Sequence, residues 1–166
     1  DRRRRLTTNR SAGRIEGVQV SAKLDYAVRA MLELAAAAPD RRTRDQVAQS
    51  RGIPGKYLEA ILGSLRQAGL VRSQRGPEGG YSLAADPGAV TVAEIARAVE
   101  GPLTLVQGMR PETVLDGPEP LAALWVAVRA SLRTVLEAVT LADLLEGQLP
   151  AEVEALIADD DAWRPH

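Results

Sequence analysis

Apolar residues recur at helical spacing in three consecutive stretches of the first half of the chain. The stretches run from Ser21 to Pro39, from Thr43 to Gly52 and from Pro54 to Gly69. Serine and threonine are preferred caps of helix N-termini, whereas glycine and proline commonly end helices. A helix, a short helix, a tight glycine-containing turn and a longer helix are together typical of a helix-turn-helix.

The pattern then changes to two short β-like runs, Leu70–Gln74 and Tyr81–Ala84. Three glycines and one proline fall within the six residues that join them, 75–80. This composition predicts a hairpin with a compact tip, because glycine reaches positive φ without steric cost. A hairpin placed directly after the second helix of a helix-turn-helix is a wing.

The remaining segments complete a predicted fold that is mainly α with a small β-hairpin wing. A helix over Val92–Glu100, capped by Thr91, closes a winged helix-turn-helix domain over residues 18–102. Residues 103–120 are rich in glycine and proline and predict a loop. One long C-terminal helix is expected over 121–147, followed by an acidic tail over 148–166 that contains a short helix.

The long helix carries an apolar stripe that is larger than a small domain needs for its own core. We therefore predict that the stripe is a dimerisation surface, with packing inside one chain as the alternative. The predicted dimerisation residues are Leu121, Leu124, Trp125, Val128, Leu132, Val135, Leu136 and Val139.

The composition excludes several kinds of chemistry. The chain has no cysteine, and its one histidine is the last residue, His166. Disulfides, thiolate catalysis and cysteine-ligated metals are therefore excluded, and we expect no catalytic residue, metal or cofactor. With 45% apolar residues the chain can bury a core, but it has no apolar run long enough to span a membrane. The first residues lack the apolar segment of a secretory signal, so we expect a cytoplasmic protein.

Charge is distributed unevenly, although the net charge is only −1. Residues 1–17 and residues 18–83 each carry +4, whereas residues 84–166 carry −9. A basic amino half fits a nucleic-acid partner, and drift in surface charge is the alternative. Residues 1–17 are interpreted either as a flexible basic arm that touches phosphates or as a stretch that is not native, with Val18 as the true start.

The chain resembles the Rrf-two (Rrf2) family of bacterial winged-helix regulators, of the IscR, NsrR and CymR type. The matching text is SAKLDYAVRAMLELA, GIPGKYLEAILGSLRQAGLVRSQRGPEGGYSLA and VTVAEIARAVEGPL, with TLADLL as a weaker match. The resemblance covers about Val18 to Leu145. It implies a cytoplasmic transcriptional regulator, in most cases a repressor, that binds a pseudo-palindromic DNA operator as a homodimer.

The resemblance also raises the question of an iron–sulfur cluster. Many members hold one on three cysteines that follow the EGPL motif, but the segment from Thr104 onward has no cysteine here. The chain therefore looks like the cluster-free branch of the family. That branch responds through a partner protein or a metabolite, so a small-molecule or protein effector is expected.

Helix 54–69 is the predicted reading helix, with its first residues nearest the bases in the major groove. Lys56 suits a phosphate or a guanine, Tyr57 can donate its hydroxyl to a phosphate, and Glu59 can accept from cytosine N4. In the family, the residues that match Tyr57 and Glu59 contact DNA. The alternatives are a core position for Tyr57 and a merely solvated one for Glu59.

Other predicted contacts lie on the hairpin and at the start of the first helix. The family residue that matches Arg75 reaches the minor groove, where the negative potential favours arginine. The flanking glycines permit close approach to phosphates or simply satisfy the turn. Ser21 and Lys23 suit a phosphate at a helix N-terminus. The alternative is that they contribute only surface charge. The predicted DNA-binding residues are thus Ser21, Lys23, Pro54, Lys56, Tyr57, Glu59, Arg75, Gly76 and Gly79.

Two other classes of function were weighed against a regulator. An enzyme lacks raw material, because no paired-carboxylate or phosphate-loop spacing is present. A winged-helix protein–protein interaction module without DNA binding is the stronger alternative, since the acidic carboxyl half suits a basic partner.

Overall fold

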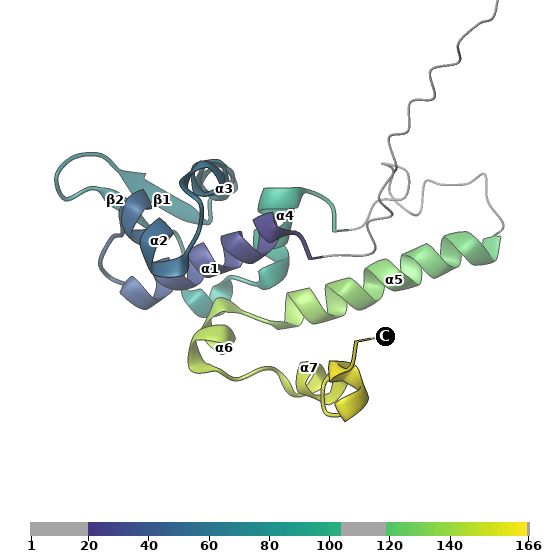
Figure 1. Cartoon of the computed structure of the whole chain (residues 1–166). Helices are drawn as coiled ribbons and strands as arrows, with labels where there is room; N and C mark the ends of the chain where they lie inside the picture. Colours follow the sequence, from purple (N-terminus) through teal and green to yellow (C-terminus); the bar gives the residue numbers. More distant parts are fainter. Residues whose placement is uncertain (1–19, 104–118, 166) are drawn as a thin grey trace, which may run out of the picture.

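The computed structural model describes residues 20–103 and 119–165. Its first three helices are α1 (Ala22–Ala37), α2 (Arg44–Arg51) and α3 (Gly55–Gln67). They are followed by a hairpin of β1 (Val71–Gln74) and β2 (Gly80–Leu83), a short 3-10 turn η1 (Pro87–Ala89) and α4 (Val92–Glu100). The predicted helix-turn-helix, wing and closing helix are therefore all present, in the predicted order (Figure 1).

Local signals explain where the helices begin and end. Ser21 accepts the amide of Leu24 at 3.0 Å, which satisfies one of the free N–H groups at the start of α1. Thr43 forms a reciprocal capping box at the start of α2, and Thr91 forms another at the start of α4. Gly52 ends α2 in the left-handed conformation, with φ of 64°.

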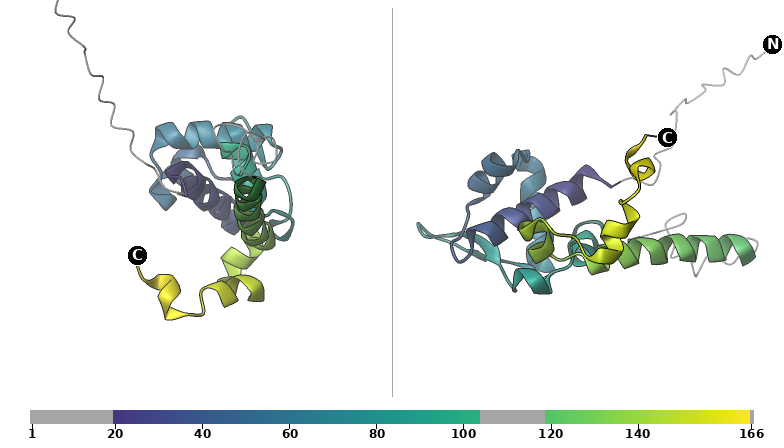
Figure 2. Two further views of the ribbon diagram at one scale, coloured as in Figure 1. Left: turned by 90° about the vertical axis from the view of Figure 1, so that its right-hand side faces the viewer. Right: turned by 90° about the horizontal axis from the view of Figure 1, so that it is seen from below.

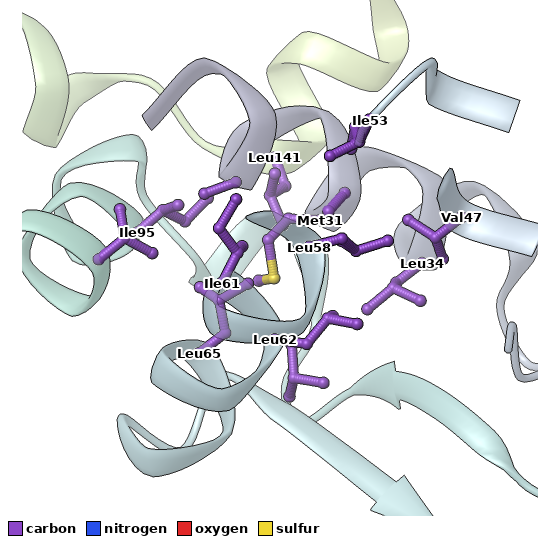
Figure 3. Packing of buried hydrophobic residues seen from close by; sticks show 14 of the residues in the cluster. Met31, Leu34, Val47, Ile53, Leu58, Ile61, Leu62, Leu65, Ile95 and Leu141 are labelled. Carbon is purple, nitrogen blue, oxygen red and sulfur yellow. The ribbon is translucent and has the colours of Figure 1, made fainter. Parts of the chain in front are cut away.

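The core lies where α1 packs against α2, α3, α4 and a later helix, α6 (Leu141–Glu146). Met31 of α1 is fully buried among apolar side chains of α3, which include Leu58 and Ile61 (Figure 3). The expected core positions of α3 are confirmed, since Leu58, Ile61, Leu62 and Leu65 are all fully buried. One face of α3 thus holds the helix in the fold and leaves its other face free.

The C-terminal half differs from the single long helix that was predicted over 121–147. Helix α5 (Glu119–Ala138) begins two residues earlier and ends before Thr140, where α6 (Leu141–Glu146) starts with its own capping box. The break occurs because the main chain pairs with the start of α4. The amide of Val92 donates to the carbonyl of Val139 at 2.9 Å, and that of Leu141 donates to the carbonyl of Val90 at 2.9 Å.

Helix α5 contacts α4 at one end and projects away from the lobe formed by α1–α4 and the hairpin, as Figure 1 and the right-hand view of Figure 2 show. Beyond α6, the predicted short acidic helix is present as α7 (Ala151–Leu156), and a 3-10 turn η3 (Asp160–Trp163) follows it. Within the described residues no helix is long and apolar enough to cross a membrane. The basic stretch 1–17 and most of the predicted loop 103–120 lie outside the described residues.

Candidate nucleic-acid interface

The first turn of α3 presents polar side chains on the face opposite the core. Pro54 is its N-cap, and the carbonyl of Pro54 accepts the amides of Tyr57 and Leu58 at 2.9 and 3.2 Å. Lys56, Tyr57 and Glu59 are all exposed, whereas Leu58 between them is fully buried. Helical periodicity therefore places these three predicted contact residues on one accessible surface.

Tyr57 is held at the surface rather than buried in the core. Its side chain is 46% exposed, and its ring lies 6.0 Å from that of Tyr26 of α1. The ammonium of Lys56 lies 5.1 Å from the centre of the Tyr57 ring, within cation–π range. These contacts favour the surface interpretation of Tyr57 over the core alternative.

Glu59 is exposed and lies near a cation that sequence analysis did not identify. Its side chain is 76% exposed, and its carboxylate lies 3.6 Å from the guanidinium of Arg44 at the start of α2. An exposed ion pair of this kind contributes little to stability. Glu59 is therefore available for a contact with a partner.

The hairpin is attached to the rest of the lobe by its second strand. β1 and β2 are antiparallel with Val71 opposite Leu83 and Gln74 opposite Gly80. Residues 75–79 form the tip, of which 75–78 are exposed. Arg42, which lies between α1 and α2, adds an isolated bridge to Tyr81 of β2. Arg75 is exposed at the tip, and it lines one surface groove together with Arg66 of α3.

The hairpin glycines have structural reasons of their own. Gly76 has φ of 107°, a conformation that other residues rarely adopt. A Cβ atom on Gly79 would lie 2.5 Å from the carbonyl oxygen of Gln74. The turn requirement therefore accounts for Gly76 and Gly79, while their approach to phosphates stays a prediction.

Ser21 and Lys23 are engaged inside the chain. The hydroxyl of Ser21 donates to the carboxylate of Glu100, and the ammonium of Lys23 donates to the carbonyl of Val99. Both contacts join the start of α1 to the end of α4, at the opposite end of α1 from the wing (Figure 1). The structure does not bring these two residues together with Arg75, and their contact with DNA stays a prediction.

A cluster around Glu33 of α1 supports the interface from behind and was not foreseen from the sequence. The carboxylate accepts hydrogen bonds from the Ser50 hydroxyl at 2.7 Å and from Arg51 Nε at 2.8 Å, and lies 3.5 Å from Arg42 Nε. The hydrogen bond from Ser50 has the largest effect on the pKa of Glu33, which it lowers together with the contacts from Arg51 and Arg42. Burial of the carboxyl group opposes this change. The cluster connects α1 to the end of α2 and to the root of the wing.

The predicted dimerisation stripe is only partly free. Leu121 and Leu124 are 42% and 51% exposed, and the members from Trp125 to Leu136 are half-buried. Val139 is the exception, because it is 6% exposed and belongs to the core near α4. This burial favours a core role for Val139 within one chain, while its assignment to the dimer interface stays a prediction.

Helix α3 is anchored by its apolar face and presents polar side chains at its exposed start. It is followed by a hairpin with an arginine at its tip. This arrangement is typical of winged-helix DNA-binding proteins. A family model described as "Rrf2: Iron-dependent Transcriptional regulator" matches residues 20–147. The chain belongs to the Rrf2 family.

Individual relatives support the same assignment. Rv1287 of Mycobacterium tuberculosis (strain H37Rv), whose name describes an HTH-type transcriptional regulator, is 44% identical over 146 residues, which cover 86% of this chain and 90% of that protein. The HTH-type transcriptional regulator CymR of Bacillus subtilis is 37% identical over 129 residues, which cover 76% and 89%. The chain is thus similar to named regulators over most of their length.

Solved structures agree with the observed fold. The structure of CymR (YrzC), described as the global cysteine regulator of B. subtilis, has a TM-score of 0.67 and 34% identity and covers 78% of this chain and 98% of its own. That of T. potens IscR has a TM-score of 0.65 and 33% identity and covers 89% and 98%. The protein is therefore a DNA-binding transcriptional regulator with a winged-helix fold.

The description of the family model mentions iron, but this chain lacks the cysteine ligands of an iron–sulfur cluster. The sequence has no cysteine, and His166 is its single histidine. In the parts of the chain that the structure describes, no group of three or more histidine, aspartate or glutamate residues could hold a metal ion. The residues present therefore do not fit an iron–sulfur cluster of the thiolate-ligated kind.

Proposed function

We propose that this regulator binds duplex DNA as a homodimer, inserts α3 into the major groove and places the wing in the adjacent minor groove. The observation that carries the proposal is the placement of Lys56, Glu59 and Arg75, which are all exposed, the first two at the start of α3 and the third at the tip of the hairpin. The same helix α3 is anchored by four fully buried residues, so its exposed face is presented rigidly.

The dimer part of the proposal rests on α5. This helix projects from the lobe with exposed Leu121 and Leu124, whose apolar surface is covered when two copies pack together. A two-fold dimer would present two reading helices, and the operator would then be pseudo-palindromic. Repression follows when the bound dimer blocks transcription, and it requires binding alone, without a catalytic step.

An effector belongs to the proposal as well. The similar solved structures include that of CymR, described as the global cysteine regulator of B. subtilis. We propose that a small molecule or a partner protein alters the dimer of this chain. The genes next to the operator would indicate which signal it is.

Selection of duplexes from a random pool tests the function directly. We expect enrichment of two inverted half-sites whose centres lie one helical turn or a multiple apart, about 10–10.5 bp per turn. Binding that is strongly salt-dependent but enriches no sequence would contradict specific recognition. Absence of binding to any duplex at low salt would favour a protein–protein interaction module instead.

A further inference from the structure

A groove of about 330 Å³ lies between the helix-turn-helix and the wing. Its walls come from the start of α2, the last turn of α3, β1 and the tip of the hairpin. Three arginines line it: Arg44 from α2, Arg66 from α3 and Arg75 from the tip. The hydroxyl-bearing residues Thr43 and Ser73 line it as well.

The cations of the groove are poorly neutralised. Neither Arg66 nor Arg75 forms an ion pair with any of the residues that the structure describes. The nearest recorded partner of Arg66 is the Ser73 hydroxyl, and the distance of 3.5 Å makes this a weak hydrogen bond. Arg44 is shared between Asp45 at 3.2 Å and Glu59 at 3.6 Å.

The backbone adds a smaller positive contribution. Helix α2 begins at the groove, where the N–H groups of its first turn carry partial positive charge, although the Thr43 side chain accepts one of them, the amide of Gln46. Asp45 in that turn offsets part of this potential. The proposed function assigns Arg75 to the minor groove, and Arg44 is shared with two carboxylates. The guanidinium of Arg66 therefore provides most of the attraction for an anion in this groove, and Arg44 adds a smaller share.

The geometry of duplex DNA indicates which anion reaches this groove. The major and minor grooves are separated by a sugar–phosphate strand, so a protein with one element in each groove must straddle that strand. The arginine-lined groove lies between the two elements that the proposed function assigns to these positions. A phosphodiester of the straddled strand would lie next to Arg66.

We infer that this groove is a binding site for a backbone phosphodiester of the operator, with Arg66 as its principal ligand and Arg44 as the second. The inference rests on the proposed function and adds to it two residues that the sequence did not single out. The planar guanidinium suits the oxygens of a phosphodiester and gives a bidentate contact. The contact carries no sequence information and holds the reading helix at a defined depth and register.

Salt dependence of binding to bulk duplex DNA tests the inference without knowledge of the operator. Each phosphate contact that is lost lowers the slope of log affinity against log salt by about one unit. We expect Arg66→Gln to lower the slope by about this amount on bulk DNA and on a selected operator alike, with the preferred sequence unchanged. Arg66→Lys should restore most of the slope, because it restores the charge.

The matched control is Arg72→Gln. Arg72 is an exposed arginine of β1, one residue from Ser73, but it does not line the groove. The control removes the same charge from the same region, and we expect it to leave the slope nearly unchanged. An equal loss of slope in both variants would mean a general charge effect and would overturn the groove as a site.

The remaining outcomes separate this inference from the function on which it rests. If the wild type binds DNA and both Arg66→Gln and Arg44→Gln keep the full slope, the groove is not a phosphodiester site, while the regulator function stands. If the wild type binds no DNA, the proposed function fails first. A competition arm compares sodium phosphate with sodium chloride at equal ionic strength. Phosphate should displace bulk DNA more strongly than chloride from the wild type but not from Arg66→Gln, and an equal phosphate effect on both proteins would overturn the groove as the phosphodiester site.

Discussion

The backbones of Arg42 and Tyr81 pair in both directions. The amide of Arg42 donates to the carbonyl of Tyr81 at 3.0 Å, and the amide of Tyr81 donates to the carbonyl of Arg42 at 2.8 Å. The side chain of Arg42 meanwhile reaches Glu33 of α1. The position of the wing relative to the reading helix therefore depends on a connection that passes through the helix-turn-helix itself.

Glu33 should matter for stability beyond what its surface location suggests. Its side chain is only 13% exposed, and two arginines and a serine depend on its carboxylate. We expect Glu33→Gln to lower the free energy of unfolding by roughly 1–3 kcal/mol, the usual worth of hydrogen bonds to a charged group. Urea denaturation measures it. Asp25→Asn, which removes an exposed pair with Arg29, is the matched control and should cost less than about 0.5 kcal/mol.

The contribution of Glu33 should also depend on pH with a definite sign. In the fold the pKa of Glu33 lies below its ordinary value of 4.5, chiefly because of the Ser50 hydroxyl and Arg51. A depressed carboxyl pKa stabilises the protein fully above the unfolded-state pKa, and this stabilisation is lost as the pH falls through the folded-state pKa. Urea midpoints of wild type and Glu33→Gln should therefore converge below pH 4.5. A difference that stayed constant through the acid range would contradict this role.

Gly80 should be intolerant of a side chain. Its φ is 142°, and a Cβ atom there would lie 2.8 Å from the carbonyl oxygen of Arg42. We expect Gly80→Ala to cost roughly 1–3 kcal/mol and to weaken DNA binding, because the wing must move away from its anchor. Thermal melts and anisotropy check both effects. Gly63→Ala, in α3 with open space around it, should instead stabilise the protein by about 0.5–1 kcal/mol.

Arg75 should contribute to DNA binding and not to assembly. It is exposed at the wing tip and forms no ion pair with another described residue. We expect Arg75→Ala to weaken operator binding by about 1–3 kcal/mol while the dimer remains intact. Fluorescence anisotropy on a selected operator and light scattering measure the two properties. Unchanged affinity would show that the wing does not reach the minor groove.

Leu124 near the start of α5 and Val139 just after its end should respond differently to substitution. Leu124 is 51% exposed near the start of the helix, so Leu124→Asp should convert the proposed dimer to a monomer without unfolding the chain. Val139 is buried, so Val139→Ala should reduce the stability of the chain by roughly 1–3 kcal/mol and leave assembly unchanged. Light scattering and urea denaturation separate the effects. A dimer that survives Leu124→Asp would place the interface elsewhere.

Elements with local signals could be predicted from the sequence. Thr43 and Gly52 define the ends of α2 through a side-chain cap and a left-handed glycine, and both contacts lie within a few residues. The break between α5 and α6 had a local signal too, because Thr140 and Asp143 form a capping-box pattern. The uninterrupted apolar stripe predicts a continuous helix only when that pattern is ignored.

The partners of charged residues could not be predicted in this way. Arg44 and Arg66 lie 22 positions apart in the sequence, and Glu33 and Arg51 lie 18 positions apart. No periodicity relates such residues, because their distance depends on how α1, α2, α3 and the hairpin pack. The same reason explains why the contacts of Ser21 and Lys23 with the end of α4 could not be predicted.

The order of helices, turn and hairpin was thus determined by the sequence alone, since caps, glycine turns and apolar periodicity act over a few residues. Tertiary structure decided which arginines share a groove and which carboxylate anchors the wing. Those features require contacts between distant parts of the chain, and only the packing of the core brings them within reach of one another.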